Sequence, residues 1–140
     1  MTTAIDTNVI VALWDREDAL NSAAQSALDA ALCRGNLIIT APVFAELMAC
    51  PDRSEGFLDS FFKDTAITVD WNLDETVWRA AGRAFQSYAA RRKKQRASGP
   101  RRILAEFLIG AYALQKGCCL ITLDDRLYRA AFPGIKIVTV

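Results

Sequence analysis

The sequence of 140 residues contains no histidine. Histidine is the usual general base near neutral pH and a frequent zinc ligand. Its absence excludes Ser-His-Asp and Cys-His catalytic arrangements and leaves no ordinary zinc site. Any hydrolytic chemistry of this chain must therefore depend on carboxylates.

Long apolar runs and secretion signals are also lacking. Although 52% of the residues are hydrophobic, their runs stop well short of the roughly 18 residues that span a bilayer. The N-terminus has no basic-then-apolar signal pattern. The four cysteines form no CxxC or Cys/His pattern, which favours reduced core thiols over a disulfide framework. We therefore expect one cytoplasmic domain over residues 1–140, without membrane contact.

What the sequence does contain is an alternation of short apolar strands and amphipathic helices. Strands are expected just before Asp6 and at residues 37–40, 66–69, 118–121 and 135–138. Between them, apolar residues recur at helical spacing, which places Met48 and Trp78 on inward helix faces. This order predicts an α/β fold, a three-layer α/β/α sandwich whose mainly parallel central sheet has four to five strands.

Two aspartates follow predicted strands directly. Asp6 comes after the first strand, and Asp124 follows the strand at 118–121. The carboxyl ends of strands in an open α/β sheet usually line the functional crevice. Thr7 and Asn8 can orient the Asp6 carboxylate or cap the next helix, and Asp6 itself could be only a helix cap.

Two glutamates occupy notable helical positions. Glu46 falls at the edge of an apolar stripe, where burial is costly unless a positive group meets it, and it could be a boundary residue paired with a lysine or arginine. Glu106 lies in a column with Gly110 and Ala113. A mid-helix glycine costs about 1 kcal/mol relative to alanine, so Gly110 is expected to permit close approach of a helix or a ligand.

These four acids suggest a site for a hard cation. Mg²⁺ and Mn²⁺ prefer oxygen ligands, and their charge offsets the repulsion between clustered carboxylates. Such a cation can activate water and stabilise charge that develops on a phosphate. The cluster therefore favours phosphodiester hydrolysis.

The basic residues are concentrated in one segment, residues 91–102. It contains seven of the seventeen lysines and arginines and no acid: Arg91, Arg92, Lys93, Lys94, Arg96, Arg101 and Arg102. A basic segment on an otherwise acidic body is typical of phosphate-backbone binding. The alternative is a solvated helix end.

Four stretches together resemble the PIN-domain ribonucleases, and within them the VapC-type toxins of toxin–antitoxin pairs. They are residues 5–9 (IDTNV), 44–47 (FAEL), 105–111 (AEFLIGA) and 120–124 (LITLD). Their order and spacing match over nearly the whole chain. The resemblance implies an endoribonuclease that uses Mg²⁺ or Mn²⁺.

Residue roles also follow from the resemblance. Asp6, Glu46, Glu106 and Asp124 match the metal-binding and catalytic acids, although the family usually has aspartate where this chain has Glu106. Thr7, Asn8 and Thr122 match polar neighbours that orient these acids, and Asp125 is a further, weaker candidate. A longer glutamate could shift the metal from tight octahedral geometry or act through a bridging water.

The partners implied by the resemblance are an RNA substrate, a second copy of the chain, and a small antitoxin that covers the acidic site. Two alternatives remain open: a binding or regulatory protein whose site is weakened by Glu106, and a housekeeping RNA-processing nuclease. A phosphotransfer domain is disfavoured, because the haloacid-dehalogenase pattern requires an aspartate where Asn8 stands.

Overall fold

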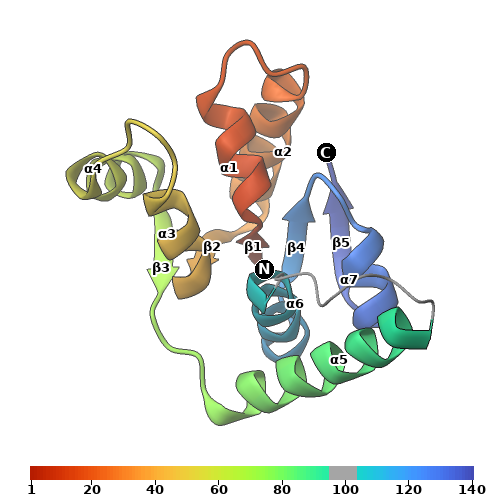
Figure 1. Ribbon diagram of the computed structural model, residues 1–140. Coiled ribbons are helices and arrows are strands. Elements are labelled where there is room, and N and C mark those ends of the chain that lie inside the picture. Colours follow the sequence, from red (N-terminus) through yellow and green to blue (C-terminus); the bar gives the residue numbers. More distant parts are fainter. Residues whose placement is uncertain (95–103) are drawn as a thin grey trace.

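The computed structural model describes residues 1–94 and 104–140. Its five strands form one wholly parallel sheet in the order β3-β2-β1-β4-β5 (Figure 1). The strands are β1 (Thr2–Ile5), β2 (Asn36–Thr40), β3 (Ile67–Asp70), β4 (Cys119–Thr122) and β5 (Lys136–Thr139). The predicted three-layer α/β/α sandwich is confirmed, with β5 at one edge as expected.

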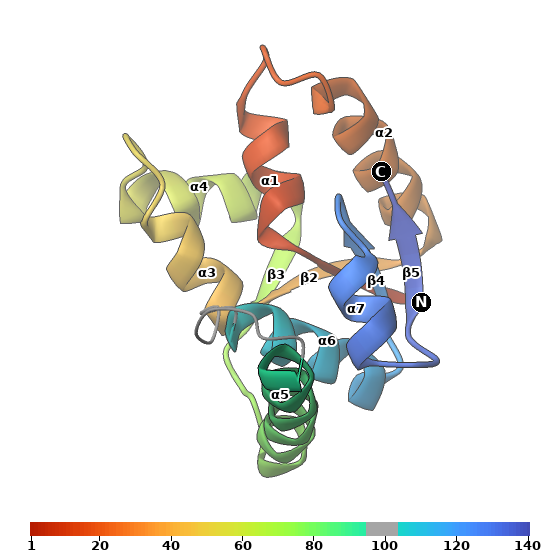
Figure 2. The ribbon, with the colours of Figure 1, turned by 45° about the vertical axis from the view of Figure 1, so that its right-hand side comes forward.

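Seven helices flank the sheet in the described part of the chain. They are α1 (Thr7–Trp14), α2 (Asn21–Arg34), α3 (Ala41–Met48), α4 (Glu55–Thr65), α5 (Glu75–Lys94), α6 (Leu104–Lys116) and α7 (Arg126–Ala131). Figure 2 shows α1 and α2 above the sheet and α5 and α6 below it. Within residues 1–94 and 104–140, no helix is both long and apolar enough to cross a membrane.

The core is densest around the central strands and α6. Ile5, Ile39 and Ile121 are at most 1% exposed, and all of residues 107–113 in α6 are buried. A continuous buried run on a helix means that it is covered on several sides. Helix α6 contacts β1 and β4 on one side and α5 and α7 on others, so residues 107–113 are packed from several directions.

Two predicted core residues are on the surface. Met48 is 42% exposed and Trp78 is 49% exposed. Helices α3 and α5 each bury a narrow stripe spaced by four residues, Val43 and Leu47 in one and Val77 and Ala81 in the other. Met48 and Trp78 each follow a residue of these stripes by one position, so their side chains point away from the buried face of the helix.

The cysteine prediction is correct in part. All four thiols are free, and Cys118 and Cys119 are buried as expected. Cys33, however, is exposed, because it lies on the outer side of the last turn of α2.

The strand order creates a crevice at one defined place. From β1 the chain builds β2 and β3 on one side, then crosses back to add β4 and β5 on the other. Connections therefore leave β1 and β4 in opposite directions, and such a switch point opens a crevice at the carboxyl ends of the strands.

Candidate functional site

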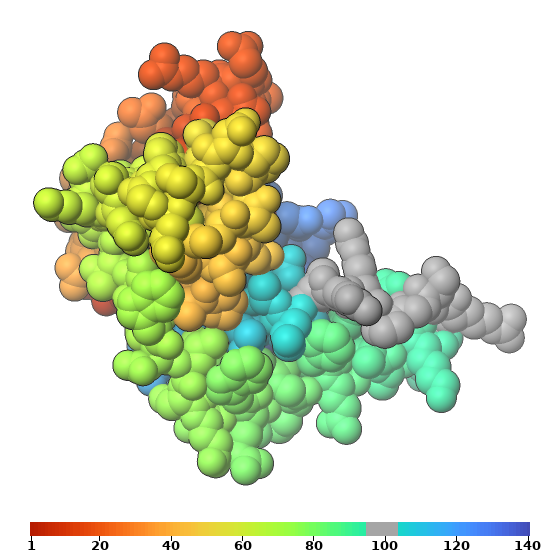
Figure 3. Space-filling model, turned by 60° about the vertical axis from the view of Figure 1, so that its left-hand side comes forward, coloured from red at the N-terminus to blue at the C-terminus, as the bar shows by residue number. Residues whose placement is uncertain are grey.

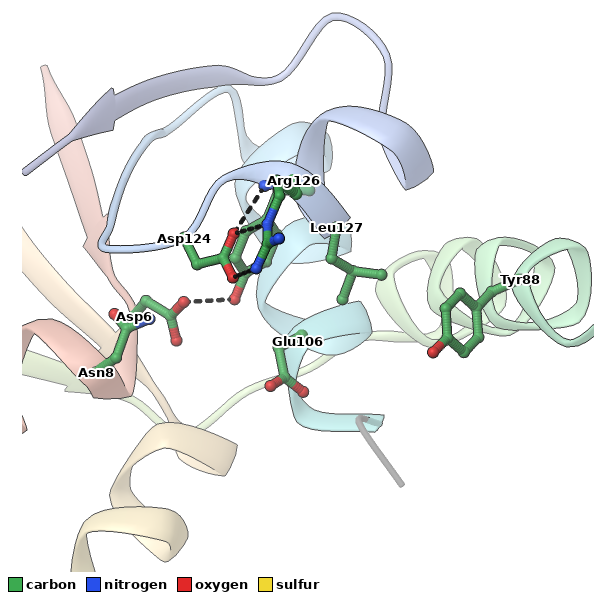
Figure 4. Close-up of a pocket in the computed structure, with 8 residues that line it drawn as sticks. Asp6, Asn8, Tyr88, Glu106, Asp124, Arg126 and Leu127 are labelled. Carbon is green, nitrogen blue, oxygen red and sulfur yellow. Dashed lines mark hydrogen bonds and ion pairs between the residues drawn. The ribbon is translucent and has the colours of Figure 1, made fainter. Parts of the chain in front are cut away.

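Two adjoining cavities lie at this switch point. The main cavity, of about 440 Å³, is lined by Asp6, Asn8, Tyr88, Glu106, Asp124, Arg126, Leu127 and Tyr128 (Figure 4). The adjoining cavity, of about 420 Å³, shares Asp6, Asn8 and Glu106 with it and adds Thr7, Asp18 and Glu46. All four predicted acids thus line one connected region, although they come from four places in the chain: the junction of β1 and α1, helix α3, helix α6 and the β4–α7 loop.

Asp6 is the buried centre of this region. It is 5% exposed, and both of its side-chain donors bind the same oxygen: Thr122 Oγ1 lies 2.8 Å and Tyr128 Oη 2.9 Å from Oδ2. Burial raises the pKa of Asp6 above its ordinary value, while these two hydrogen bonds act in the opposite direction. The site therefore holds a carboxylate that benefits from a nearby positive charge.

The predicted polar neighbours of Asp6 form hydrogen bonds that join the start of α1 to the loop after β4. Thr122 is fully buried, and its hydroxyl also accepts from the backbone N–H of Asp124 at 3.2 Å. Asn8 Oδ1 accepts from the backbone N–H of Leu123 at 3.3 Å. These bonds fix the loop after β4 against the start of α1, which sets the position of Asp124 beside Asp6.

Glu46 differs from expectation in its surroundings. It is exposed rather than tucked against the core, and Thr7 Oγ1 donates to its Oε1 at 2.6 Å. No cation is needed to offset desolvation, because solvent reaches the carboxylate from the cavity. Thr7 thus holds Glu46 at the rim of the adjoining cavity.

Asp124 faces an arginine of its own loop. Arg126 donates from Nε to Oδ1 at 3.0 Å and from Nη2 to Oδ2 at 2.8 Å (Figure 4). The pair is on the surface, since the side chain of Asp124 is 53% exposed. Hydrogen bonding to Asp124 raises the pKa of Arg126 further, so the guanidinium keeps its charge. Asp125 instead forms an ion pair with Arg129 and lines neither cavity.

The predicted basic segment begins beside the main cavity. Arg91, Arg92, Lys93 and Lys94 form the last turn of α5, and the Arg92 guanidinium lies 5.7 Å from the ring centroid of Tyr88, which lines the cavity. Arg96, Arg101 and Arg102 lie outside the described residues. Figure 3 shows the start of α6 between α3 and α5, so the acidic and basic elements are neighbours.

Tyr128 and Arg126 are the site residues that sequence reasoning missed. Both belong to α7, which has six residues, too few for apolar spacing to indicate an inward face. The sequence nevertheless contained an indication of Tyr128, because a tyrosine one helical turn after Asp124 can direct its hydroxyl toward the carboxyl end of β4.

The donor set suits a hard cation in its chemistry. Every candidate ligand is a carboxylate, and no thiol or imidazole competes. Across residues 1–94 and 104–140, however, no three acids or cysteines already converge closely enough to hold an ion. Glu46 is turned to Thr7 and Asp124 to Arg126, so a cation at Asp6 would require these exposed side chains to turn inward.

Comparison with known proteins gives a family and a set of similar folds. The PIN domain family matches residues 3–133. One similar structure is VapBC2 from Rickettsia felis bound to a promoter DNA fragment, with 14% identity, coverage of 100% of this chain and 99% of that chain, and a TM-score of 0.64. A toxin–antitoxin complex from Klebsiella pneumoniae has 20% identity, coverage of 98% and 96%, and a TM-score of 0.62. FitAcB from Neisseria gonorrhoeae has 20% identity, the same coverage and a TM-score of 0.65. A comparison with curated proteins gives no match.

Proposed function

Since the chain belongs to the PIN-domain family, whose members are generally nucleases that use divalent metal ions, we propose that it is a Mg²⁺- or Mn²⁺-dependent endoribonuclease. It hydrolyses RNA phosphodiester bonds in the cytoplasm and is the toxin of a VapBC-type pair. A toxin–antitoxin complex and a VapBC structure share its fold over 98% or more of the chain, which supports the toxin assignment.

The observation that carries the proposal is the position of Asp6. A carboxylate that is 5% exposed lies where Glu46, Glu106 and Asp124 line the same connected cavities. Burying a charge is costly unless a partner compensates it. A cation-binding role explains why an acid rather than an asparagine occupies this position.

We assign Asp6, Glu46, Glu106 and Asp124 as the residues that hold the cation, with Thr7, Asn8 and Thr122 orienting them. When bound, the metal would lower the pKa of a water and neutralise charge on the phosphate. Asp6 is held in place by hydrogen bonds from Thr122 and Tyr128. The exposed side chains of Glu46 and Asp124 would turn toward the cation when it binds.

The basic end of α5 supports an RNA substrate. Arg91, Arg92, Lys93 and Lys94 carry four positive charges on the last turn of α5, where Arg92 lies over Tyr88 of the main cavity. Such charges bind a phosphate backbone by releasing condensed counterions. Tyr88, which lines the same cavity, offers an aromatic face on which an unpaired base can stack.

A protein partner is the second part of the proposal. We propose a homodimer and a small antitoxin whose peptide covers the acidic cavities, since the similar structures include a toxin–antitoxin complex. Trp71 supports a partner surface, because it is 59% exposed and its ring packs on Phe44 at 4.9 Å between centroids. Exposed aromatic side chains are enriched at interfaces.

Two observations favour a second candidate, a PIN-fold binding or regulatory protein. Asp124 is held by Arg126, and Glu106 is a glutamate where the resemblance implies aspartate. If both features prevent cation binding, the basic helix end would still bind RNA without cutting it.

The deciding experiment is Asp6→Asn assayed on single-stranded RNA with Mg²⁺ or Mn²⁺. We expect loss of cleavage, with Asp59→Asn as the matched control because Asp59 is exposed on α4, away from both cavities. Full activity of Asp6→Asn contradicts the assignment of Asp6. If the native chain neither binds metal nor cuts any RNA but still binds RNA, the regulatory candidate replaces the nuclease.

A further inference from the structure

Tyr128 has a buried hydroxyl with a specific partner. The residue is 1% exposed, and its Oη donates to Asp6 Oδ2 at 2.9 Å from a helix 122 positions later in the chain. Phenylalanine would fill the same volume without a polar group to satisfy. Packing alone therefore accounts for the ring of Tyr128 but not for its hydroxyl.

The hydroxyl restricts how the Asp6 carboxylate can turn. Thr122 and Tyr128 both donate to Oδ2, so this oxygen is anchored from two elements, β4 and α7. Figure 4 shows the other Asp6 oxygen turned toward the side of Glu106. A carboxylate that is anchored through one oxygen presents the second in a fixed direction, which is how outer hydrogen bonds orient metal ligands.

The position of the Tyr128 ring depends on Gly110 of α6. A Cβ on Gly110 would lie 3.1 Å from Cδ1 of Tyr128 and 2.4 Å from the ring of Phe132. The missing side chain lets α7 approach α6 closely enough for the hydroxyl to reach Asp6. The close approach predicted at Gly110 is thus made by aromatic rings of a neighbouring helix and the turn that follows it.

We propose that Tyr128 is a positioning residue for the cation site, and that its hydroxyl holds Asp6 in the orientation that presents Oδ1 to the cavity. The inference rests on the proposed function, because it requires Asp6 to be a ligand. It goes beyond that function by giving α7 a role in ligand geometry, without contact between Tyr128 and the cation.

The test is Tyr128→Phe, titrated with Mn²⁺ by calorimetry on the full chain. Loss of an outer hydrogen bond typically weakens metal binding by about 10- to 100-fold, and we expect a loss in this range. The matched control is Tyr112→Phe. Tyr112 is also buried and donates to an aspartate, Asp70, at 2.6 Å, but neither residue lines the cavities. The control should bind Mn²⁺ as the native chain does.

The outcomes separate this inference from the proposed function. If the native chain binds Mn²⁺ and Tyr128→Phe binds it equally well, the positioning role is wrong and the nuclease proposal stands. If both tyrosine variants lose affinity equally, the effect is general destabilisation and the positioning role is also wrong. If the native chain binds no Mn²⁺, the proposed function itself fails, and the inference fails with it.

A second measurement does not depend on the folding of Tyr128→Phe. The chain has three tyrosines, so 3-fluorotyrosine labelling gives three ¹⁹F resonances, which Tyr88→Phe and Tyr112→Phe assign. A Mg²⁺ titration should shift the Tyr128 resonance with the same affinity as a calorimetric titration of the native chain with Mg²⁺, and leave that of Tyr112 in place. A Tyr128 resonance that stays unmoved at saturating Mg²⁺ overturns the inference.

Discussion

Arg126 donates a hydrogen bond to each carboxylate oxygen of Asp124, from Nε to Oδ1 at 3.0 Å and from Nη2 to Oδ2 at 2.8 Å. A cation at Asp124 must compete with this guanidinium. Because the Arg126 side chain is 87% exposed, the ion pair is screened and the competition is weak. We expect Arg126→Gln to tighten Mn²⁺ binding in calorimetry by about fivefold or less. Arg129→Gln is the matched control, since Arg129 pairs with Asp125 outside the cavities; a similar gain there would point to net charge alone.

Glu106→Asp tests the residue at which the resemblance described above implies aspartate and this chain has glutamate. The change keeps the charge and shortens the side chain by one methylene. If the longer side chain displaces the cation, the variant should bind Mg²⁺ more tightly and cleave RNA faster, while Mn²⁺ partly rescues the native chain. Parallel Mg²⁺ titrations and cleavage rates measure this. Equal values for both proteins would establish Glu106 as an equivalent ligand.

The basic end of α5 should govern the salt dependence of RNA binding. Replacing Arg91, Arg92, Lys93 and Lys94 with glutamine should weaken binding, and each lost phosphate contact should lower the slope of log K against log salt by about 0.7. Fluorescence anisotropy at several salt concentrations measures the slope. Arg34→Gln combined with Lys63→Gln, on α2 and α4, is the control. An unchanged slope in the α5 variant would show that this helix end is merely solvated.

Two mid-helix glycines should respond oppositely to alanine. At Gly110 a Cβ would lie 2.4 Å from the buried Phe132 ring, so overpacking should outweigh the helix-propensity gain and lower the free energy of unfolding by about 1–3 kcal/mol. At Gly82 of α5 nothing lies within 4 Å of the added Cβ, so alanine should stabilise by up to about 1 kcal/mol. Urea unfolding measures both; stabilisation at Gly110 would contradict the packing described.

The raised pKa of Asp6 predicts a pH-dependent stability difference. Because burial raises this pKa, the folded chain holds the proton more tightly than the unfolded chain, whose carboxyl titrates near pH 3.9. The free energy of unfolding contributed by Asp6 therefore falls as pH rises through the folded pKa. Asp6→Asn should be more stable than native at pH 7 in metal-free buffer, and this advantage should disappear below about pH 4. If Asp6→Asn remains more stable than the native chain by the same amount below pH 4, the raised pKa of Asp6 is not the cause of the difference.

Much of the fold follows from local pattern. Each strand is a short apolar run, and parallel pairing is expected when helices separate the strands. Asp6 and Asp124 could be found because strand ends are visible in the sequence. Met48 and Trp78 could not be placed correctly, since periodicity identifies an apolar face but not whether another element covers it.

The missed parts of the site depend on contacts between distant residues. Tyr128 of α7 reaches Asp6 because Gly110 allows α7 to pack closely against α6. The contact thus depends on residues from three separate parts of the chain. The partner of Glu46 was expected to be a cation, but Thr7 supplies a hydroxyl. Such pairings depend on distances within the folded chain, which spacing along one helix does not specify.

The central place of β1 has a consequence for synthesis. Asp6 and the Thr122 hydroxyl that anchors it are separated by 116 positions, and β1 lies between β2 and β4. On the ribosome Asp6 emerges 116 residues before Thr122. Such high contact order delays assembly until most of the chain is available. A nascent chain that stops before β4 therefore carries Asp6 without its hydroxyl anchors, so the orientation of this carboxylate is fixed only after β4 and α7 have been synthesised.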